Sequence, residues 1–301
     1  LTHSIHSAGI DVQTTALSFE LFPPKTEEQR ELMWRSVAQL RRYAPEYFSV
    51  TFGAGGSTLD YTVTTVRELR EQHGLDAAPH LSCMGGTRAE IRALLGAYAE
   101  LGCRRIVALR GDMPSGMATP GEFAYAVDLV RFIRAEFGDH FRLEVAAYPE
   151  FHPQAVSADA DLRHFVEKCR AGADAAITQY FFNADAYFRF VEVVRAEGVE
   201  IPIIPGIMPI ANFSQLRRFS AMCGAEIPRW LERRLSAMGD DADAIRSYGA
   251  DVVAELCRRL LAGGAPGLHI YTLNRARATT AILDRLGIRL VYTSPSPRDF
   301  L

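Results

Sequence analysis

One residue that could take part in catalysis is a glutamate inside an apolar segment. Glu20 lies within Ser18–Phe22, and Pro23 and Pro24 end that segment. An apolar environment disfavours a charged carboxylate, so Glu20 can hold a proton near neutral pH and act as a general acid. An ion pair at the rim of the fold is the alternative, because charged residues are seldom buried without a partner.

A second group of polar residues follows another apolar segment. Arg110, Gly111 and Asp112 come directly after Arg105–Leu109. The glycine lets a planar ligand approach the backbone closely, while the arginine and the aspartate supply a hydrogen-bond donor and an acceptor. A turn that contains an aspartate is the alternative interpretation.

Aromatic and amide side chains end two further segments. Tyr148 and His152 follow Arg142–Ala147, and Gln179 lies among aromatic residues in Thr178–Phe182. Stacking rings beside an amide are typical of a site for a flat heterocycle with hydrogen-bonding edges. Structural aromatics and an ordinary core strand are the alternatives, although a core strand explains Gln179 least well.

Eight apolar segments with the composition of strands recur along the chain. Amphipathic helical patterns, such as Arg88–Leu101 and Ala186–Ala196, lie between them. Most segments start about 25 to 35 residues apart, the length of a strand-helix unit. The last interval is longer and leaves room for extra helices near Pro228–Leu235 and Ala242–Leu261. The eight segments are Ala16–Phe22, Tyr47–Phe52, Pro79–Met84, Arg105–Leu109, Arg142–Ala147, Ala175–Phe181, Ile201–Ile207 and Gly267–Leu273.

This alternation predicts an α/β fold, a (β/α)8 TIM barrel with extra helices between strands 7 and 8. The catalytic groups of such barrels lie at the C-terminal ends of the strands. Thr51, His80, Tyr271 and Arg275 also follow or end predicted strands, so polar residues gather at one end of the barrel. An open doubly wound sheet is the alternative, but the glycine cluster Gly53–Gly56 follows the second strand and lacks the G-x-G-x-x-G spacing.

Composition narrows the class of protein and its partners. The chain has 301 residues, 48% of them hydrophobic, and no linker divides it, so we expect one domain over residues 1–290. The Ser/Pro-rich residues 291–301 read as a disordered or non-native tail. A formal net charge of -3 with interspersed signs indicates a small-molecule partner and no nucleic acid or membrane.

The spacing of the cysteines and the lack of known catalytic motifs argue against several other classes of protein. Five widely spaced cysteines without a C-x-x-C pair argue against a disulfide framework and against a metal site. No apolar run approaches about 18 residues, which favours a soluble cytoplasmic protein. No Ser-His-Asp order, H-E-x-x-H motif or P-loop spacing is present, so hydrolase, metalloprotease and nucleotidase functions are disfavoured and cofactor chemistry remains.

Seven motifs of the chain, taken together, resemble the methylenetetrahydrofolate reductase family in its bacterial type, catalytic domain only. They occur in the family's order between about residues 16 and 288, and their joint specificity is far above that of any one motif. The motifs are Ser18–Lys25, Val50–Ser57, Pro79–Leu81, Leu109–Asp112, Ala147–Glu150, Ile177–Phe182 and Tyr271–Arg275.

The resemblance implies a flavoenzyme of one-carbon metabolism and methionine biosynthesis, in the form of a homo-oligomer. NADH or NADPH would reduce non-covalently bound FAD, leave, and be replaced by 5,10-methylenetetrahydrofolate, which becomes 5-methyltetrahydrofolate in a ping-pong reaction. Glu20 matches the acid that protonates the folate amine nitrogen, so that the five-membered ring opens. Asp112 matches an acidic residue whose charge favours the folate cation.

The same resemblance implies two sets of binding residues. Arg110 and Lys168 suit the diphosphate or ribose of FAD, Gln179 suits the pterin edge, and Phe219 can stack on either substrate. The chain departs from the family at His164 and Glu167, where bacterial relatives can carry Asn and Arg. The flavin set comprises Thr51, His80, Arg110, Gly111, Asp112, Tyr125, Ala126, Tyr148, His152, Asp161, His164 and Lys168, and the folate set comprises Gln179, Gln215, Phe219, Tyr271 and Arg275.

Two other functions stay open at this point. Another barrel flavoenzyme, such as a proline dehydrogenase-like oxidase, would bind FAD without turning over the folate. A non-catalytic flavin- or folate-binding subunit would keep the barrel without an active acid, and the presence of Glu20 and Asp112 argues against it.

Overall fold

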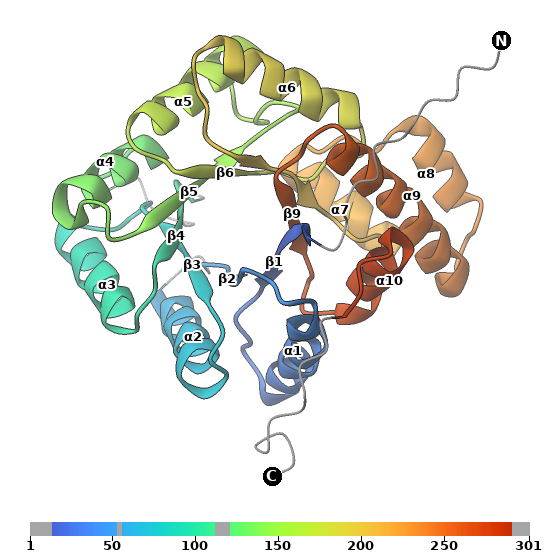
Figure 1. The fold of residues 1–301 in the computed structure, drawn as a ribbon, viewed down its shortest axis with the longest axis horizontal. Helices are drawn as coiled ribbons and strands as arrows, with labels where there is room; N and C mark the ends of the chain where they lie inside the picture. Colours follow the sequence, from blue (N-terminus) through green and yellow to red (C-terminus); the bar gives the residue numbers. More distant parts are fainter. Residues whose placement is uncertain (1–13, 53–55, 112–120, 291–301) are drawn as a thin grey trace.

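The computed structural model describes residues 14–52, 56–111 and 121–290, and these form a ring of parallel strands surrounded by helices (Figure 1). The strand order is β7-β6-β5-β4-β3-β2-β1-β9-β8, and every pair is parallel. The strands are β1 (Ala16–Leu21), β2 (Tyr47–Val50), β3 (Ala77–Ser82), β4 (Arg105–Leu109), β5 (Arg142–Ala147), β6 (Ala175–Thr178), β7 (Ile203–Ile204), β8 (Gly206–Ile207) and β9 (Gly267–Tyr271).

Helices alternate with the strands and cover the outside of the ring. Thr26, Thr87, Ser157 and Asn212 begin four of them as N-caps, each accepting a hydrogen bond from a backbone N–H of the first turn. The helices are α1 (Glu27–Leu40), α2 (Gly56–Arg67), α3 (Arg88–Glu100), α4 (Ala126–Phe137), α5 (Ala158–Arg170), α6 (Ala184–Ala196), α7 (Phe213–Cys223), α8 (Arg229–Ser236), α9 (Ala242–Ala262) and α10 (Ala276–Leu286), with short helical turns at Arg41–Tyr43 and Glu68–Gln72.

The predicted (β/α)8 barrel is confirmed, with one correction at the seventh strand. The segment Ile201–Ile207 forms two short strands, β7 and β8, which pair with β6 and β9 respectively and close the ring. Pro205 lies between them and has no N–H to donate to a neighbour, so the ladder is interrupted there. The extra helices expected between the last two barrel strands are α8 and α9.

Contacts between β6, β8 and β9 bridge the interruption of the ladder at Pro205. We call these contacts the seam. Gly206 N donates to Thr178 Oγ1 at 2.9 Å, and the Tyr271 hydroxyl donates to Thr178 O at 2.7 Å. A Cβ atom on Gly206 would lie 2.1 Å from Thr178 O, so only glycine permits this approach. The seam therefore depends on side chains as well as on the sheet.

Alternate residues of the strands pack in different layers. In β1, Leu17, Phe19 and Leu21 belong to the large apolar core shared with the helices. The intervening Ser18 and Glu20 face the barrel interior, where Ser18 Oγ lies 2.7 Å from His269 Nδ1 of β9. The interior of this barrel is thus unusually polar at β1 and β9, and this position brings Glu20 to the mouth of the barrel.

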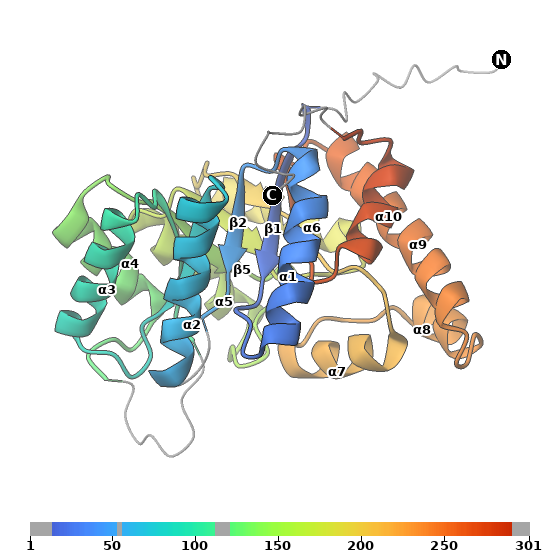
Figure 2. The ribbon, with the colours of Figure 1, turned by 90° about the horizontal axis from the view of Figure 1, so that it is seen from below.

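Helix α7 has a position different from the other helices. Figure 2 shows it lying across one end of the barrel, whereas α1 and α2 run along the wall. Within the described residues, no helix is long and apolar enough to cross a membrane. The predicted tail, residues 291–301, lies outside the described residues.

Candidate active site

A cavity of about 340 Å³ opens at the C-terminal ends of the strands. Its volume falls within the range of small-molecule sites, about 300–1,000 Å³, and its position is that of active sites in (β/α)8 barrels. Polar groups are few and converge from different strands. The lining consists of Glu20, Phe22, Thr51, His80, Val107, Leu109, Ala146, Tyr148, Ile177, Gln179, Tyr180, Met208, Phe219, Met222, Cys223, His269, Tyr271 and Leu273.

Glu20 lies at the base of this cavity and faces residues of β3 and β9. Its side chain is 11% exposed, and Oε2 lies 3.5 Å from His80 Nε2 and 3.8 Å from His269 Nε2. The Thr272 hydroxyl donates to Glu20 O at 2.6 Å and fixes the backbone. Among the described residues that line the cavity, Glu20 alone carries a carboxyl group.

The two histidines that face Glu20 are buried, and each has an unused nitrogen. His80 Nε2 and His269 Nε2 both lack a hydrogen-bond partner within the described part of the chain. Burial is the main cause that lowers the pKa of His80 to about 4; the Glu20 carboxylate opposes this shift, and the neighbouring His269 adds to it. His80 is therefore a neutral imidazole at neutral pH, and it can accept or donate one hydrogen bond at the site.

The rest of the cavity wall carries amide and aromatic groups. Gln179 Oε1 accepts from Tyr180 N at 3.0 Å. The Tyr148 ring meets the His152 ring edge-on with centroids 4.6 Å apart. Burial raises the pKa of Tyr271 well above its ordinary value, as does the Glu20 carboxylate, so Tyr271 keeps the proton that it donates to Thr178 O. Phe219 reaches the cavity from α7.

Three predicted flavin residues, on two loops and on α5, form a connected group outside the cavity lining. Arg110 Nη2 donates to Gln154 Oε1 at 2.6 Å, and Gln154 N donates to His152 Nδ1 at 3.0 Å. His152 N donates to Asp161 Oδ2 at 2.8 Å. The loop after β4 is thereby linked to the loop after β5 and to α5, through a glutamine that the sequence analysis did not select.

Other predicted flavin residues lie on α4 and α5. The Tyr125 ring stacks on the His164 ring, with centroids 6.0 Å apart and an interplanar angle of 12°. Ala126 is the first residue of α4. Lys168 Nζ donates to Ala146 O at 2.5 Å, and burial lowers its pKa to about 8 against the opposing charge of Asp161. These residues lie beside the cavity and do not line it.

The turn after β4 can be described only in part. Gly111 has a φ of +80°, and a Cβ atom there would lie 1.8 Å from Ser82 Oγ, so this turn requires glycine. Asp112, the second predicted catalytic residue, lies outside the described residues.

Two predicted folate residues are not brought into the cavity. Gln215 lies in the first turn of α7, where its N–H donates to Asn212 Oδ1 at 2.8 Å. Arg275 is exposed and precedes the first residue of α10. Both stay close in sequence to lining residues, Phe219 and Leu273 respectively.

The sequence analysis missed His269 and Ser18. Both lie two residues before a predicted site residue, Tyr271 and Glu20 respectively, and side chains at that spacing in a strand share a face. Period-two alternation in the first and last barrel strands was therefore the signal that could have identified them. Among the described residues, no group of three or more His, Cys, Asp or Glu is placed to hold a metal ion.

The fold and the site define a (β/α)8-barrel enzyme with a carboxyl group and two imidazoles at the mouth of the barrel. The family model of methylenetetrahydrofolate reductase matches residues 6–287. The chain belongs to this family, which is a family of oxidoreductases.

Relatives support this assignment, and a solved structure shares the fold. The chain is 41% identical over 273 residues to a 5,10-methylenetetrahydrofolate reductase of Salmonella typhimurium, covering 91% of each chain. It is 37% identical over 287 residues to methylenetetrahydrofolate reductase (NADH) 1 of Arabidopsis thaliana, covering 91% of this chain and 48% of that protein. The fold is similar, with a TM-score of 0.60 and 18% identity, to a Clostridium thermocellum protein whose structure binds two copies of 5-methyl-5,6,7,8-tetrahydrofolic acid, over 91% and 94% of the two chains.

Proposed function

We propose that this protein reduces 5,10-methylenetetrahydrofolate to 5-methyltetrahydrofolate in a ping-pong reaction, with FAD as cofactor and NADH or NADPH as hydride donor. The observation that carries the proposal is the buried carboxyl group of Glu20, which faces two imidazoles at the base of the cavity. Membership of the methylenetetrahydrofolate reductase family and the names of the relatives support it.

Glu20 is proposed as the general acid of the folate step. The five-membered ring of the substrate must open before its methylene carbon can accept hydride, and opening requires a proton on the departing amine nitrogen. His80, with a pKa of about 4, is not protonated to imidazolium at neutral pH and cannot be the acid. Glu20 carries the one carboxyl group in the described lining of the cavity, and a positioned acid of this kind contributes about 10²–10⁴-fold to a rate.

The cavity fits the ring system of a flavin. Its lining is mainly apolar, and the orphaned Nε2 of buried His80 supplies a hydrogen-bonding group that the protein itself leaves unused. Thr51, His80 and Tyr148 would hold the ring, while Arg110, His152, Asp161 and Lys168 on the adjoining loops and on α5 would hold the phosphates and ribose. Bound FAD would supply the transfer of hydride from the nicotinamide to the folate.

The folate is proposed to lie against the amide and aromatic wall of the cavity. The Gln179 side chain suits the hydrogen-bonding edge of the pterin, and Phe219 and Tyr271 supply flat apolar surfaces. Gln215 and exposed Arg275 lie outside the lining, so we assign them to the part of the folate that extends beyond the cavity. Arg275 matches the negative charge of the glutamate carboxylates of folate.

Anaerobic stopped-flow absorbance tests this proposal. NADH or NADPH should bleach the flavin of the purified protein, and 5,10-methylenetetrahydrofolate should then restore its absorbance. A flavin that NADH and NADPH reduce but the folate does not reoxidise would indicate another barrel flavoenzyme. A protein that binds flavin or folate without either half-reaction would indicate a binding subunit.

The cellular setting follows from the same proposal. We place the reaction in cytoplasmic one-carbon metabolism, where 5-methyltetrahydrofolate supplies methionine biosynthesis. Residues 1–290 would form the single catalytic domain, and the working form would be a homo-oligomer. Light scattering of the purified protein measures its mass directly, and the mass of a monomer would contradict the proposed homo-oligomer.

A further inference from the structure

A side-chain hydrogen bond holds the wall of the cavity at the end of β6, where the strand ladder is interrupted. The Tyr271 hydroxyl donates to Thr178 O at 2.7 Å. Thr178 is the last residue of β6, and its carbonyl group belongs to the peptide that joins it to Gln179. Tyr271 therefore holds the backbone directly before the amide side chain that we assign to the pterin.

This hydrogen bond occupies the place of a missing ladder bond. Ala176 of β6 is in register with Ile203 of β7. Parallel strands space their hydrogen bonds evenly, so a continuous ladder would bring the N–H of Gly206 to Thr178 O. Gly206 N donates instead to the Thr178 hydroxyl oxygen at 2.9 Å, and the carbonyl oxygen is left for Tyr271. A Cβ atom on Gly206 would lie 2.7 Å from the Tyr271 hydroxyl oxygen, so the glycine also leaves room for the tyrosine.

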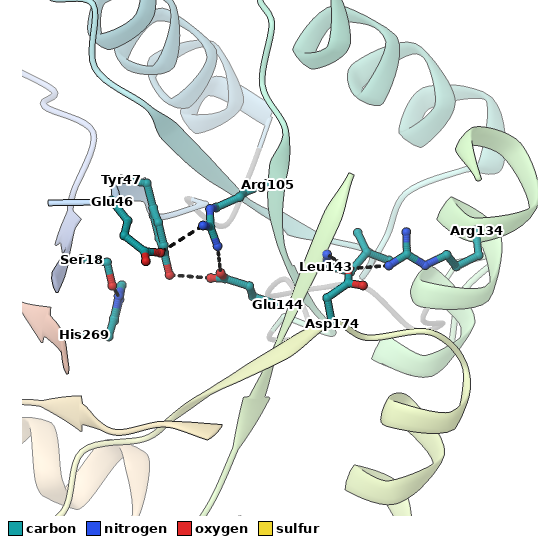
Figure 3. A network of polar contacts seen from close by, with 9 residues as sticks. All are labelled: Ser18, Glu46, Tyr47, Arg105, Arg134, Leu143, Glu144, Asp174 and His269. Carbon is teal, nitrogen blue, oxygen red and sulfur yellow. Dashed lines mark hydrogen bonds and ion pairs between the residues drawn. The ribbon is translucent and has the colours of Figure 1, made fainter. Parts of the chain in front are cut away.

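The ring that carries this hydroxyl packs between two other rings. It meets the His269 ring edge-on with centroids 5.4 Å apart, and the Tyr180 ring edge-on with centroids 6.4 Å apart. Figure 3 shows His269 beside Ser18, whose Oγ lies 2.7 Å from His269 Nδ1 inside the barrel. These contacts involve the ring of Tyr271 and not its hydroxyl, so they should persist in Tyr271→Phe.

The amide of Gln179 has a defined orientation. Its Oε1 accepts from Tyr180 N at 3.0 Å, and Gln179 N donates to Ala147 O of β5 at 2.8 Å. A backbone N–H can only donate, so the oxygen of the amide, and not its nitrogen, must face Tyr180 N. The Nε2 group, which carries two hydrogens, is left for a ligand. Gln179 thus offers hydrogen-bond donors, which suit the acceptor atoms on the edge of a pterin.

We propose that Tyr271 is a positioning residue for Gln179: its hydroxyl fixes the peptide between Thr178 and Gln179, so that the amide N–H groups of Gln179 meet acceptor atoms of the folate ring. The inference rests on the proposed function, in which Gln179 contacts the pterin. Without the hydroxyl, Thr178 O loses its donor and the peptide can rotate, which carries the Gln179 side chain with it. The ring at position 271 would still line the cavity.

The first measurement follows the amide itself and needs neither nucleotide nor folate. In ¹⁵N-labelled protein, the side-chain N–H signals of Gln179 are identified by their loss in Gln179→Ala. We expect these signals to move in Tyr271→Phe, because the peptide before Gln179 is no longer held. Unchanged Gln179 signals in Tyr271→Phe would contradict the inference.

The second measurement is a double-mutant cycle on the folate half-reaction in anaerobic stopped flow. Tyr271→Phe should raise the concentration of 5,10-methylenetetrahydrofolate that gives half the maximal rate by about 5-fold, which corresponds to one hydrogen bond of ordinary strength. The maximal rate should stay within about twofold. In Gln179→Ala, the further change Tyr271→Phe should alter this concentration by less than about twofold, because the residue through which Tyr271 acts is absent. The same factor in both backgrounds would overturn the inference.

A matched control is Tyr187→Phe. Tyr187 is also buried, and its hydroxyl also donates to a backbone carbonyl of a barrel strand, Ile203 O at 2.8 Å. Neither residue belongs to the described lining of the cavity. Urea unfolding should show a similar loss of stability in Tyr187→Phe and Tyr271→Phe, but Tyr187→Phe should keep the Gln179 signals and the folate concentration of the unsubstituted protein. An effect on folate as large as that of Tyr271→Phe would mean that lost stability, and not position, is the cause.

Gln179→Glu tests the orientation of the amide. A carboxylate can still accept from Tyr180 N but has no hydrogen to offer the folate, so the half-maximal concentration should rise at least as much as in Gln179→Ala. Folate binding as tight as in the unsubstituted protein would overturn the assignment of Gln179 as a donor. Failure of the folate half-reaction in the unsubstituted protein would instead count against the proposed function.

Discussion

The Oε2 atom of Glu20 lies 3.5 Å from Nε2 of His80, and both side chains are almost fully buried. This pair connects β1 and β3 across the barrel interior. Because His80 has a pKa of about 4 in the folded protein, against an ordinary value of 6.5, the folded state resists its protonation. Burial of the imidazole is the main cause of this low pKa, and the Glu20 carboxylate opposes it.

We expect the free energy of unfolding to fall on acidification between about pH 6.5 and pH 4 in part because of His80. The unfolded chain binds the proton more readily in that window, so stability is lost as pH falls, by about 3 kcal/mol for a difference of this size. Urea unfolding of His80→Gln at several pH values should show a shallower pH dependence than the unsubstituted protein. Ser49→Ala changes the buried register partner of Glu20 on β2, which does not titrate, and it should retain the slope. Equal slopes in all three proteins would contradict the assignment.

Two glycine substitutions should have opposite effects on stability, one at the interrupted seventh strand and one inside α3. Gly206→Ala places a Cβ atom 2.1 Å from the Thr178 carbonyl oxygen, which belongs to the backbone and cannot swing away. We expect a loss of about 3 kcal/mol in the free energy of unfolding, the upper part of the range for overpacking. Gly96→Ala lies inside α3 with nothing within 4 Å and should stabilise the protein by about 0.5–1 kcal/mol. Chemical denaturation measures both free energies of unfolding. An unchanged free energy of unfolding for Gly206→Ala would contradict the close approach of Gly206 to Thr178 O.

Substitution of Gln179 should weaken the binding of the folate and leave the reaction with NADH or NADPH unchanged. Gln179→Ala removes the amide from the cavity wall, so we expect the KM for 5,10-methylenetetrahydrofolate to rise by about 10-fold or more, the effect of a lost hydrogen bond of about 1.5 kcal/mol. The rate of flavin reduction by NADH or NADPH should be unchanged. Gln72→Ala, at an exposed position outside the barrel, is the control and should retain both values. An equal loss in both half-reactions would indicate a structural role for Gln179.

Much of the fold could be predicted because local pattern determines it. Arg105–Leu109 and Arg142–Ala147 have the predicted bounds, and α8 and α9 fill the long interval before the last strand. The split at Pro205 was harder to predict, because it depends on which residues of β6 and β9 lie opposite. Proline is visible in the sequence, whereas the compensating contact between Tyr271 and Thr178 arises from the closed ring.

The lining of the cavity could be predicted where strand ends and family motifs coincide, as at Glu20, His80 and Gln179. The lining could not be predicted where the position of a side chain depends on packing between segments that are distant in the sequence. The contact between Ser18 and His269 joins residues 251 positions apart, and it exists only in one register of β1 against β9. Arg275 was expected in the folate set, but at the start of α10 it is exposed and lies outside the lining of the cavity.

The central claim is that Glu20 donates the proton in the folate step, and Glu20→Gln in anaerobic stopped flow tests it directly. The glutamine keeps the size of the side chain but has no carboxyl proton to give. We predict that NADH or NADPH bleaches the flavin at the rate of the unsubstituted protein, while reoxidation by 5,10-methylenetetrahydrofolate slows by at least about two orders of magnitude. Glu31→Gln, on the exposed face of α1, is the control and should leave both rates unchanged. Reoxidation of Glu20→Gln at the unsubstituted rate would contradict the assignment.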